Sequence, residues 1–349
     1  MKPASRFSAL SLLILACIGL LATGCPSKVL NKRPFVPTSV STQPEPGQKY
    51  LQFMAVGDFG DVPAMSGGKP NGRKAVADAM VKLAGRETPK FVLVLGDNFY
   101  QSGVKSASDS QFRTKFEDVY TDPVWQSVNF FVVLGNHDHR GNPDAQVEYA
   151  RSHPDSKWKM PARYYTWKET IEASTEIQFF ALDTNPLCGH PEGKRATQQE
   201  INDQLAWLER ELKKANEANV RWKIVFGHHP RYSGGMHGSD DSPHMKKLEA
   251  LFKDYNVDVF LTGHDHDVQL IQVNGVHYIV SGGGAEGRNV DMQKDQIIKD
   301  HLIYAGTSCG FTAFRASKEK IYCQFYSGTA ENQLPNPLDG PDYGFSISK

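Results

Sequence analysis

Five short polar clusters, each preceded by an apolar run, contain side chains that bind metal ions in proteins. In chain order they supply an aspartate, an aspartate with a tyrosine, an asparagine with a histidine, a histidine, and a pair of histidines. The clusters occupy residues 57–60, 96–100, 135–138, 227–229 and 263–266. Two metal ions that together hydrolyse a phosphate ester lie roughly 3.5–4 Å apart and share a bridging carboxylate. The clusters therefore predict a binuclear metal site and metal-assisted hydrolysis of phosphate esters.

The ligand types divide into an anionic set and a largely neutral set. Asp58, Asp97 and a phenolate from Tyr100 would place three negative charges around one ion. Hard anionic oxygens favour a hard trivalent ion, so we expect Fe³⁺ there, with His266 completing its coordination. The other set shares only Asp97 with the first and suits a divalent ion, namely Fe²⁺, Zn²⁺ or Mn²⁺. Its neutral members are Asn136, His228 and His264.

The spacing of the ligands lets neighbours in the chain reach a common point. Asp97 and Tyr100 are three residues apart, so a turn after a strand presents both on one side. His264 and His266 are two apart, so in extended backbone their rings share a face while Asp265 points away. One such cluster alone would be ordinary, because an aspartate after a strand is commonly a turn or helix cap. Several clusters with different ligand types in one chain make coincidence improbable.

The apolar runs before the clusters are short and uninterrupted, which is typical of strands covered on both faces. Polar residues at the carboxyl ends of such strands occupy the usual ligand position of α/β sheets. The runs are 53–56, 91–95, 130–134, 224–226 and 257–261. Apolar spacing predicts a helix over 73–83, and Thr197 with Glu200 forms a capping-box pattern before a second helix. Further strands are expected over 276–280, 310–314 and 321–326.

Composition places the chain among ordinary globular proteins. Its 349 residues include 39 Lys and Arg against 39 Asp and Glu, and 40% of the residues are hydrophobic. A formal net charge of zero provides no general attraction for nucleic acid, so we expect no such partner. Cys188, Cys309 and Cys323 permit one disulfide in an oxidising compartment and contain no Cys-x-x-Cys metal pair.

The N-terminal segment has the pattern of an export signal. Lys2 and Arg6 precede an apolar stretch over 9–22 that is too short for a comfortable membrane span. The small residues before Cys25 resemble a bacterial lipoprotein signal, so residues 1–24 are expected to be removed and Cys25 to carry lipid. A plain secretory signal cut nearby is the alternative. We expect an exported bacterial protein, periplasmic or anchored to the outer membrane, with no other membrane contact.

Changes in composition divide the remaining chain into three parts. Residues 25–48 are rich in Pro, Ser, Thr and Lys without apolar periodicity, which is typical of a tether. The catalytic domain is expected over 49–330 and as a monomer. The Pro- and Gly-rich tail over 331–349 is expected to be irregular.

The five clusters together resemble the metallophosphoesterase superfamily, and within it the purple acid phosphatases. Tyr100 marks that branch, because most relatives lack a phenolate at this position. The runs over 135–149 and 263–269 are similar to the small, tartrate-resistant mammalian type of purple acid phosphatase. The resemblance implies a calcineurin-like α/β fold, a four-layer sandwich of two mixed β-sheets flanked by helices.

The resemblance also implies roles for individual residues. The Fe³⁺ ligands would be Asp58, Asp97, Tyr100 and His266. The ligands of the divalent ion would be Asp97, Asn136, His228 and His264. His137 would contact the substrate phosphate or donate a proton, and His237 matches a second histidine near the metal pair. The sequence departs from the mammalian type at His229, where that type has tyrosine, and in a shorter segment after Cys188.

We therefore expect an acid phosphatase that hydrolyses phosphate monoesters by attack of a metal-activated hydroxide at an Fe(III)–M(II) centre. Activity in mild acid is consistent with a histidine that serves as proton donor. One alternative is a phosphodiesterase or pyrophosphatase on the same scaffold, which would differ only in the shape of its substrate cleft. Another is a surface lipoprotein that binds without catalysis and retains an inactive metal site.

Overall fold

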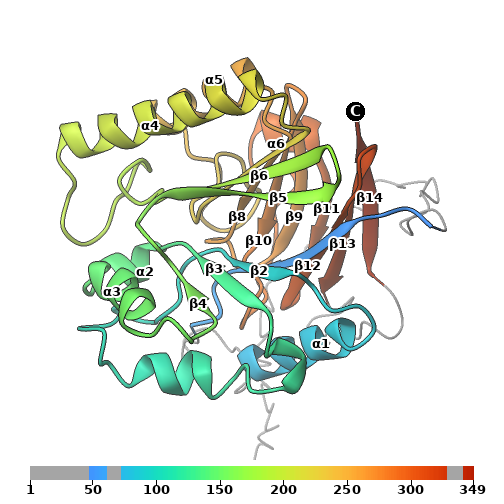
Figure 1. Ribbon diagram of the computed structural model, residues 1–349. Helices are drawn as coiled ribbons and strands as arrows, with labels where there is room; N and C mark the ends of the chain where they lie inside the picture. Colours follow the sequence, from blue (N-terminus) through green and yellow to red (C-terminus); the bar gives the residue numbers. More distant parts are fainter. Residues whose placement is uncertain (1–46, 61–71, 328–340) are drawn as a thin grey trace, which may run out of the picture. The chain divides into compact units, whose positions relative to one another are not determined.

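Two mixed β-sheets of seven strands each form the centre of the described structure (Figure 1). The computed structural model describes residues 47–60, 72–327 and 341–349. In spatial order the first sheet is β14-β13-β12-β1-β2-β3-β4, and the second is β11-β9-β10-β8-β7-β6-β5. Each sheet combines parallel and antiparallel pairs. The parallel strands of a sheet present their carboxyl ends at the same edge.

The first sheet has a parallel half and an antiparallel half. Its parallel strands are β1 (Leu51–Val56), β2 (Phe91–Val94), β3 (Asn129–Val132) and β4 (Trp158–Lys159). Its antiparallel strands are β12 (Gly310–Ala316), β13 (Lys320–Ser327) and β14 (Tyr343–Ser348). β1 joins the halves, because it pairs in parallel with β2 and antiparallel with β12. The loops after β1, β2 and β3 consequently leave the sheet at the same edge.

The second sheet has a parallel centre and antiparallel margins. The parallel strands are β6 (Thr175–Ala181), β7 (Trp222–Phe226), β8 (Val259–Thr262) and β10 (Val276–Ser281). The antiparallel strands are β5 (Tyr165–Glu172), β9 (Val268–Val273) and β11 (Leu302–Gly306). The loops after β7 and β8 therefore leave this sheet side by side.

The inner faces of the two sheets share one hydrophobic core. Phe53 of β1 stacks on Phe314 of β12, with 4.6 Å between ring centroids. The same ring meets Phe179 of β6 edge to face at 5.2 Å, and Phe91 of β2 meets Phe179 at 5.1 Å. Aromatic pairs of this kind contribute about 0.5–1.5 kcal/mol each beyond the burial of their area. These contacts hold the sheets face to face, which fixes the separation of the loops at their edges.

Helices cover the outer faces of both sheets (Figure 1). α1 (Gly72–Ala84) contacts β12 of the first sheet. α4 (Gln198–Glu217) and α5 (Pro243–Asp254) pack their buried leucines against Val225 and Phe260 of the second sheet. The shorter helices are α2 (Asn136–His139), α3 (Asp144–Ser152), α6 (Gln296–His301), the π-helix Arg113–Glu117 and the 3-10 helix Pro123–Trp125.

The start of α4 confirms the capping box that the sequence indicates. The hydroxyl oxygen of Thr197 accepts the backbone N–H of Glu200 at 3.2 Å. The Glu200 carboxylate in turn accepts the backbone N–H of Thr197 at 2.7 Å. Two N–H groups that the helix leaves without partners are thereby satisfied.

The two sheets and their flanking helices confirm the expected four-layer architecture. One expectation was wrong, because the tail over 331–349 is not irregular throughout: Tyr343–Ser348 forms β14 and pairs with β13. Tyr343, Phe345 and Ile347 alternate with smaller residues, and this strand pattern follows the Pro- and Gly-rich residues that suggested irregularity.

Several predictions concern segments or properties that the described residues address only in part. The export signal over 1–24 and the tether, except for its last two residues, lie outside the described residues. Within the described part of the chain, no helix has the length and apolar character needed to cross a membrane. Cys188, Cys309 and Cys323, all of them described, form no disulfide with one another.

Candidate metal centre

The loops after the parallel strands bring the predicted ligands together in a buried site. Asp58 follows β1, Asp97 follows β2 and Asn136 follows β3, while the predicted histidines follow β7 and β8. The two aspartates are 1% and 2% exposed, and His228 is fully buried at 0%. Charged groups at this depth are costly unless they are paired or bind a metal ion, so the burial itself points to a site rather than to turn residues.

Three of the predicted ligands converge on the hydroxyl of a fourth, Tyr100, and the four residues form what we call the oxygen-rich cluster. The Tyr100 oxygen lies 2.8 Å from Oδ2 of Asp97, 3.0 Å from Oδ1 of Asp58 and 3.0 Å from Nε2 of His266. This geometry confirms that the turn after β2 presents Asp97 and Tyr100 on one side.

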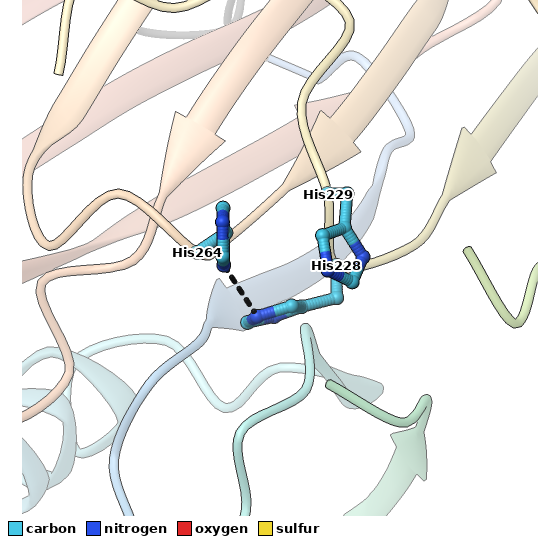
Figure 2. A group of neighbouring side chains, drawn as sticks. All are labelled: His228, His229 and His264. Atoms are coloured by element: carbon cyan, nitrogen blue, oxygen red, sulfur yellow. Dashed lines mark hydrogen bonds between the residues drawn. The ribbon is translucent and has the colours of Figure 1, made fainter. Parts of the chain in front are cut away.

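The other predicted residues form the histidine-rich cluster, which consists of Asn136, His228 and His264. Nε2 of His228 lies 3.2 Å from Oδ1 of Asn136 and 3.2 Å from Nδ1 of His264 (Figure 2). The same nitrogen is 3.4 Å from Oδ2 of Asp97. This Asp97 oxygen therefore faces both clusters, which is the arrangement that a bridging carboxylate needs.

The buried carboxylates of the site raise the pKa values of the groups around them. Burial, followed by the nearby carboxylates of Asp58 and Asp97, raises the pKa of Tyr100 well above its ordinary value. Burial acts against the charged form of His228, but Asp97 and then Asp58 raise its pKa to about 9. For His266, burial is likewise outweighed by the hydrogen bonds to Asp58 and then Glu286, which raise the pKa to about 9. Protons on the histidines offset the negative charge of the carboxylates here. A pair of metal ions would offset the same charge, and both clusters offer donor atoms of the types that bind metals.

Hydrogen bonds from outside the clusters orient the ligand atoms. Nδ1 of His228 donates to the carbonyl oxygen of Leu95 at 2.8 Å, which leaves Nε2 for the site. Nδ1 of His266 lies 3.1 Å from Glu286 Oε2, which leaves its Nε2 beside Tyr100. The Asn136 amide nitrogen donates to Oε1 of Glu192 at 3.2 Å, so its oxygen points to the site. Such partners fix which atom a ligand presents to a metal.

The backbone at three predicted ligands is left-handed. The φ angles are 59° at Asp58, 52° at Asp97 and 70° at His264. Non-glycine residues adopt this region rarely, and it is concentrated at functional sites where the surroundings enforce it. The backbone at His264 therefore differs from the extended conformation on which the spacing argument was based. The two rings still reach the site, and Asp265 points away from it, where it accepts the backbone N–H of His237 at 2.8 Å.

Asp138 is a structural residue of the site that the sequence argument missed. Its carboxylate accepts backbone N–H groups of Asn98 at 3.1 Å and Gly135 at 2.8 Å, and the amide of Gln146 at 2.8 Å. Burial, and then the charge of Asp97, raise the pKa of Asp138 to about 6. The hydrogen bonds tie the loop after β2 to the loop after β3. No sequence signal separates this aspartate from a ligand, because it stands inside a metal-binding cluster.

A cavity of about 690 Å³ opens above the two clusters. His137, His237, Arg140, Arg288 and Glu192 are among its lining residues. Nδ1 of His137 lies 2.7 Å from the carbonyl oxygen of Gln101 and 3.0 Å from Nη1 of Arg140, so this side of the ring is held by its neighbours. Both sequence-predicted histidines thus line the space that a substrate would occupy.

Two acidic residues near the cavity were also missed by the sequence argument. Glu192 pairs with Arg140 at the rim and accepts from Asn136. Glu286 pairs with Arg288 at 2.9 Å and with His266. Both lie in loops that come next to the site only in the folded chain, and neither belongs to a metal-binding motif. The glycine-rich stretch that contains Glu286 gives no indication of this role.

Comparison with known proteins agrees with this geometry. Residues 51–268 match the family model of the calcineurin-like phosphoesterases. Tartrate-resistant acid phosphatase type 5 from Oryctolagus cuniculus is 38% identical over 251 residues, which cover 67% of this chain and 73% of that protein. Purple acid phosphatase 7 from Arabidopsis thaliana is 30% identical over 288 residues, 79% of this chain and 82% of that protein.

A solved structure adds support for the fold alone. GAP50, described as the anchor in the inner membrane complex of Plasmodium, superposes with a TM-score of 0.72 at 23% identity. The superposition covers 86% of this chain and 89% of that one. Because one fold hosts many functions, the site and the sequence relatives have to carry the argument about chemistry.

The chain belongs to the calcineurin-like phosphoesterase family. The expected resemblance to the purple acid phosphatases is confirmed by the plant purple acid phosphatase and the mammalian tartrate-resistant acid phosphatase among these relatives. These relatives imply a binuclear metal centre, and the donor atoms of Asp58, Asp97 and His228 lie within 4.8 Å of one another, close enough to share an ion.

Proposed function

We propose that this chain is an acid phosphatase that hydrolyses phosphate monoesters at an Fe(III)–M(II) centre, with Fe, Zn or Mn as the divalent ion. The observation that carries the proposal is the contact of the Tyr100 hydroxyl with two buried carboxylates, those of Asp58 and Asp97, at 3.0 and 2.8 Å. Three anionic oxygens at one point suit a trivalent ion, and the adjoining neutral donors suit a divalent one.

The residues of the two clusters would hold the metal pair. The oxygen-rich cluster would bind Fe³⁺, the histidine-rich cluster would bind the divalent ion, and Asp97 would contact both. The chemistry supplied by such a pair, when bound, is activation of water as a nucleophile and neutralisation of charge on the phosphoryl group. Outside the clusters, the other oxygen of Asp97, Oδ1, accepts the backbone N–H of His137 at 2.9 Å, which couples the shared carboxylate to the residue next to the substrate.

His137 is the residue that would serve the leaving group. Its Nδ1 contacts the Gln101 carbonyl and Nη1 of Arg140, which leaves Nε2 as the nitrogen that would reach a substrate in the cavity. An imidazolium there donates to the departing ester oxygen, as general acid catalysis in mild acid requires. His237 lies against the His264 ring, at 4.1 Å between centroids, and lines the same cavity, where it would contact the phosphoryl group.

The arginines at the cavity would attract and orient the anionic substrate. Arg140 and Arg288 both line the cavity, and each is held by a carboxylate, Glu192 and Glu286 respectively. A guanidinium that is already fixed by one partner loses little freedom when it binds a phosphate. This arrangement favours a doubly charged monoester over a singly charged diester.

The test of this proposal is turnover of matched aryl esters by the purified, metal-loaded protein. We expect kcat/KM for para-nitrophenyl phosphate to exceed that for the bis(para-nitrophenyl) diester by at least about tenfold, a difference of roughly 1.4 kcal/mol in transition-state stabilisation. A preference for the diester would indicate a phosphodiesterase on the same scaffold, and turnover of a pyrophosphate would indicate a pyrophosphatase. Two bound metals without turnover of any ester between pH 4 and 8 would indicate a binding lipoprotein.

We also propose that the protein is exported and held at a membrane by lipid on Cys25, and that it is a monomer. Support comes from the apolar stretch, the small residues before Cys25 and the tether composition. Expression of the full chain in a bacterial host should place it in the membrane fraction, and Cys25→Ser should release it. Membrane retention of Cys25→Ser would contradict the anchor, and a dimer on gel filtration of the released protein would contradict the monomer.

A further inference from the structure

His229 has no role in the function proposed above, yet it lines the cavity. Its ring lies beside those of His228 and His264 (Figure 2). The side chain is buried, and its centroid lies 4.9 Å from that of His228 and 4.7 Å from that of His264. One of its nitrogens lies within 4.8 Å of nitrogens on both neighbours. A ring at this place could act as a further metal ligand or as a hydrogen-bond donor. A ligand nitrogen must carry no proton, whereas a donor nitrogen must carry one.

Thr184 decides which nitrogen of His229 carries the proton. The Thr184 hydroxyl oxygen accepts the backbone N–H of His228 at 3.1 Å and that of His229 at 2.9 Å. A hydroxyl has two lone pairs and one hydrogen, so these two bonds use both lone pairs. The same oxygen lies 2.9 Å from Nδ1 of the His229 ring. This third contact must therefore be the hydroxyl donating to Nδ1.

An accepting Nδ1 places the proton of the neutral ring on Nε2. Among residues 47–60, 72–327 and 341–349, only Thr184 hydrogen-bonds to the ring of His229, so Nε2 has no partner there, and the residue lines the cavity. A protonated Nε2 has no lone pair to offer a metal ion. The hydrogen bond from Thr184 therefore argues against His229 as a metal ligand, although His229 lies close enough to His228 and His264 to share an ion with them.

We propose that His229 is a substrate-binding residue whose Nε2–H donates a hydrogen bond to a phosphoryl oxygen on the side of the histidine-rich cluster. The inference rests on the proposed phosphatase function. Donors that are already oriented toward the position of developing charge stabilise it without reorganisation, and a hydrogen bond to a charged oxygen is stronger than one to a neutral group.

The first experiment compares His229→Phe, His229→Gln and, as a matched control, His153→Phe on the exposed surface. Inorganic phosphate is titrated by calorimetry into each metal-loaded protein, and metal content is measured on the same samples. We expect His229→Phe to keep both ions and to bind phosphate about ten- to a hundredfold more weakly, as expected for loss of one hydrogen bond to a charged group. His229→Gln, which restores an N–H donor, should recover most of the affinity, and the control should match wild type.

Two results of that experiment would overturn the proposal. If His229→Phe and His229→Gln each lost one metal ion, His229 would be a metal ligand. Unchanged phosphate affinity in a fully loaded His229→Phe would make it a packing residue. Phosphate affinity is read on the same preparations as ester turnover. A wild type that fails to hydrolyse esters would therefore refute the phosphatase function, while the titration would still decide the role of His229.

A second measurement is independent of whether the variants fold well. Long-range ¹⁵N–¹H spectra of the wild-type protein, loaded with diamagnetic gallium and zinc and labelled at histidine, report the tautomer of each ring. We expect the ring of His229 to be neutral with its proton on Nε2. The signal of this ring is assigned as the one that disappears in His229→Gln. A proton on Nδ1, or a metal-bound Nε2, would contradict the inference.

Discussion

The two halves of the metal centre are built from opposite donor types on the same framework. In the oxygen-rich cluster a phenol and two carboxylates surround one point, whereas in the histidine-rich cluster two imidazoles and an amide do so. Each half draws its side chains from loops of both sheets. The difference therefore lies in the residues placed at the strand ends and not in the sheets that present them.

The halves also differ in how their groups are held. Asp58 and Asp97 each accept a backbone N–H from a neighbouring loop, at 2.8 Å from His264 and 2.9 Å from His137. The imidazole of His228 instead donates outward, to the Leu95 carbonyl. N–H donors stabilise negative charge on the carboxylates of the first half, whereas the Leu95 carbonyl fixes which nitrogen of His228 points into the second. The comparison teaches that the backbone around the first half stabilises anionic ligands, whereas in the second half it orients a ring.

The largest effect is expected where the two halves meet. Asp97→Ala removes the oxygen that lies 2.8 Å from Tyr100 and 3.4 Å from His228. Both halves should lose affinity for their ion, and kcat/KM should fall by roughly three orders of magnitude or more, since a metal pair supplies several kcal/mol of stabilisation. Elemental analysis with aryl phosphate turnover measures this. Asp155→Asn on the exposed surface is the control, and retention of two ions by Asp97→Ala would show that the halves are independent.

Metal removal should destabilise the fold through both halves. Chelation leaves the buried carboxylates and the phenol of the oxygen-rich cluster without their cation, so the free energy of unfolding should drop. At a ligand concentration of about 1,000 times the dissociation constant, binding contributes roughly 4 kcal/mol. Calorimetric melting of the loaded and chelated protein measures the change, and re-addition of iron and zinc should reverse it. Equal melting temperatures would mean that the clusters do not bind metal in the native state.

Most of the residues compared here could be predicted from the sequence, because each metal-binding cluster is a short segment directly after an apolar run. Asp58, Asp97, Tyr100 and the histidines stand directly after apolar runs, so residue type and position together indicate a site. The carboxylates that support the site were not readable. Asp138, Glu192 and Glu286 act through partners that are distant in the chain or through backbone N–H groups, and these contacts exist only after the loops have been brought together.

The same reasoning explains the errors in the predicted backbone. The spacing of His264 and His266 was interpreted as that of extended backbone. A left-handed φ of 70° at His264 instead turns the loop, and both rings still reach the site. β14 was missed because its pattern lies beyond a Pro- and Gly-rich stretch and its partner β13 is needed to stabilise it. Pairing between strands is a tertiary property that local composition does not encode.

The next prediction separates the halves. His264→Ala removes a nitrogen that lies 3.2 Å from Nε2 of His228 and leaves the oxygen-rich cluster intact. We expect loss of the divalent ion, retention of the iron, and a fall in kcat/KM of about a hundredfold or more, since one half of a two-metal site no longer acts on the substrate. Metal analysis decides the result, with His153→Phe as the control. Loss of iron in preference to the divalent ion would reverse the assignment of the two halves.

A smaller effect is expected from Glu286→Gln. Glu286 lies 3.1 Å from Nδ1 of His266 and thereby leaves Nε2 beside Tyr100. An amide accepts this hydrogen bond more weakly than a carboxylate, so His266 should become a poorer donor and iron affinity should fall by about tenfold. Competition with a chelator measures this affinity, while the divalent ion should be held as in wild type. An unchanged iron affinity would mean that Glu286 serves only Arg288.

The visible absorption spectrum of the oxidised, metal-loaded protein tests the central claim most directly. A phenolate of Tyr100 bound to Fe³⁺ gives a broad charge-transfer band and a violet or pink colour, and Tyr100→Phe should abolish that band. Tyr255→Phe, which removes a hydroxyl outside the site, should leave it unchanged. A colourless wild type after oxidation, or a band that survives in Tyr100→Phe, would contradict the assignment of a trivalent ion to the oxygen-rich cluster.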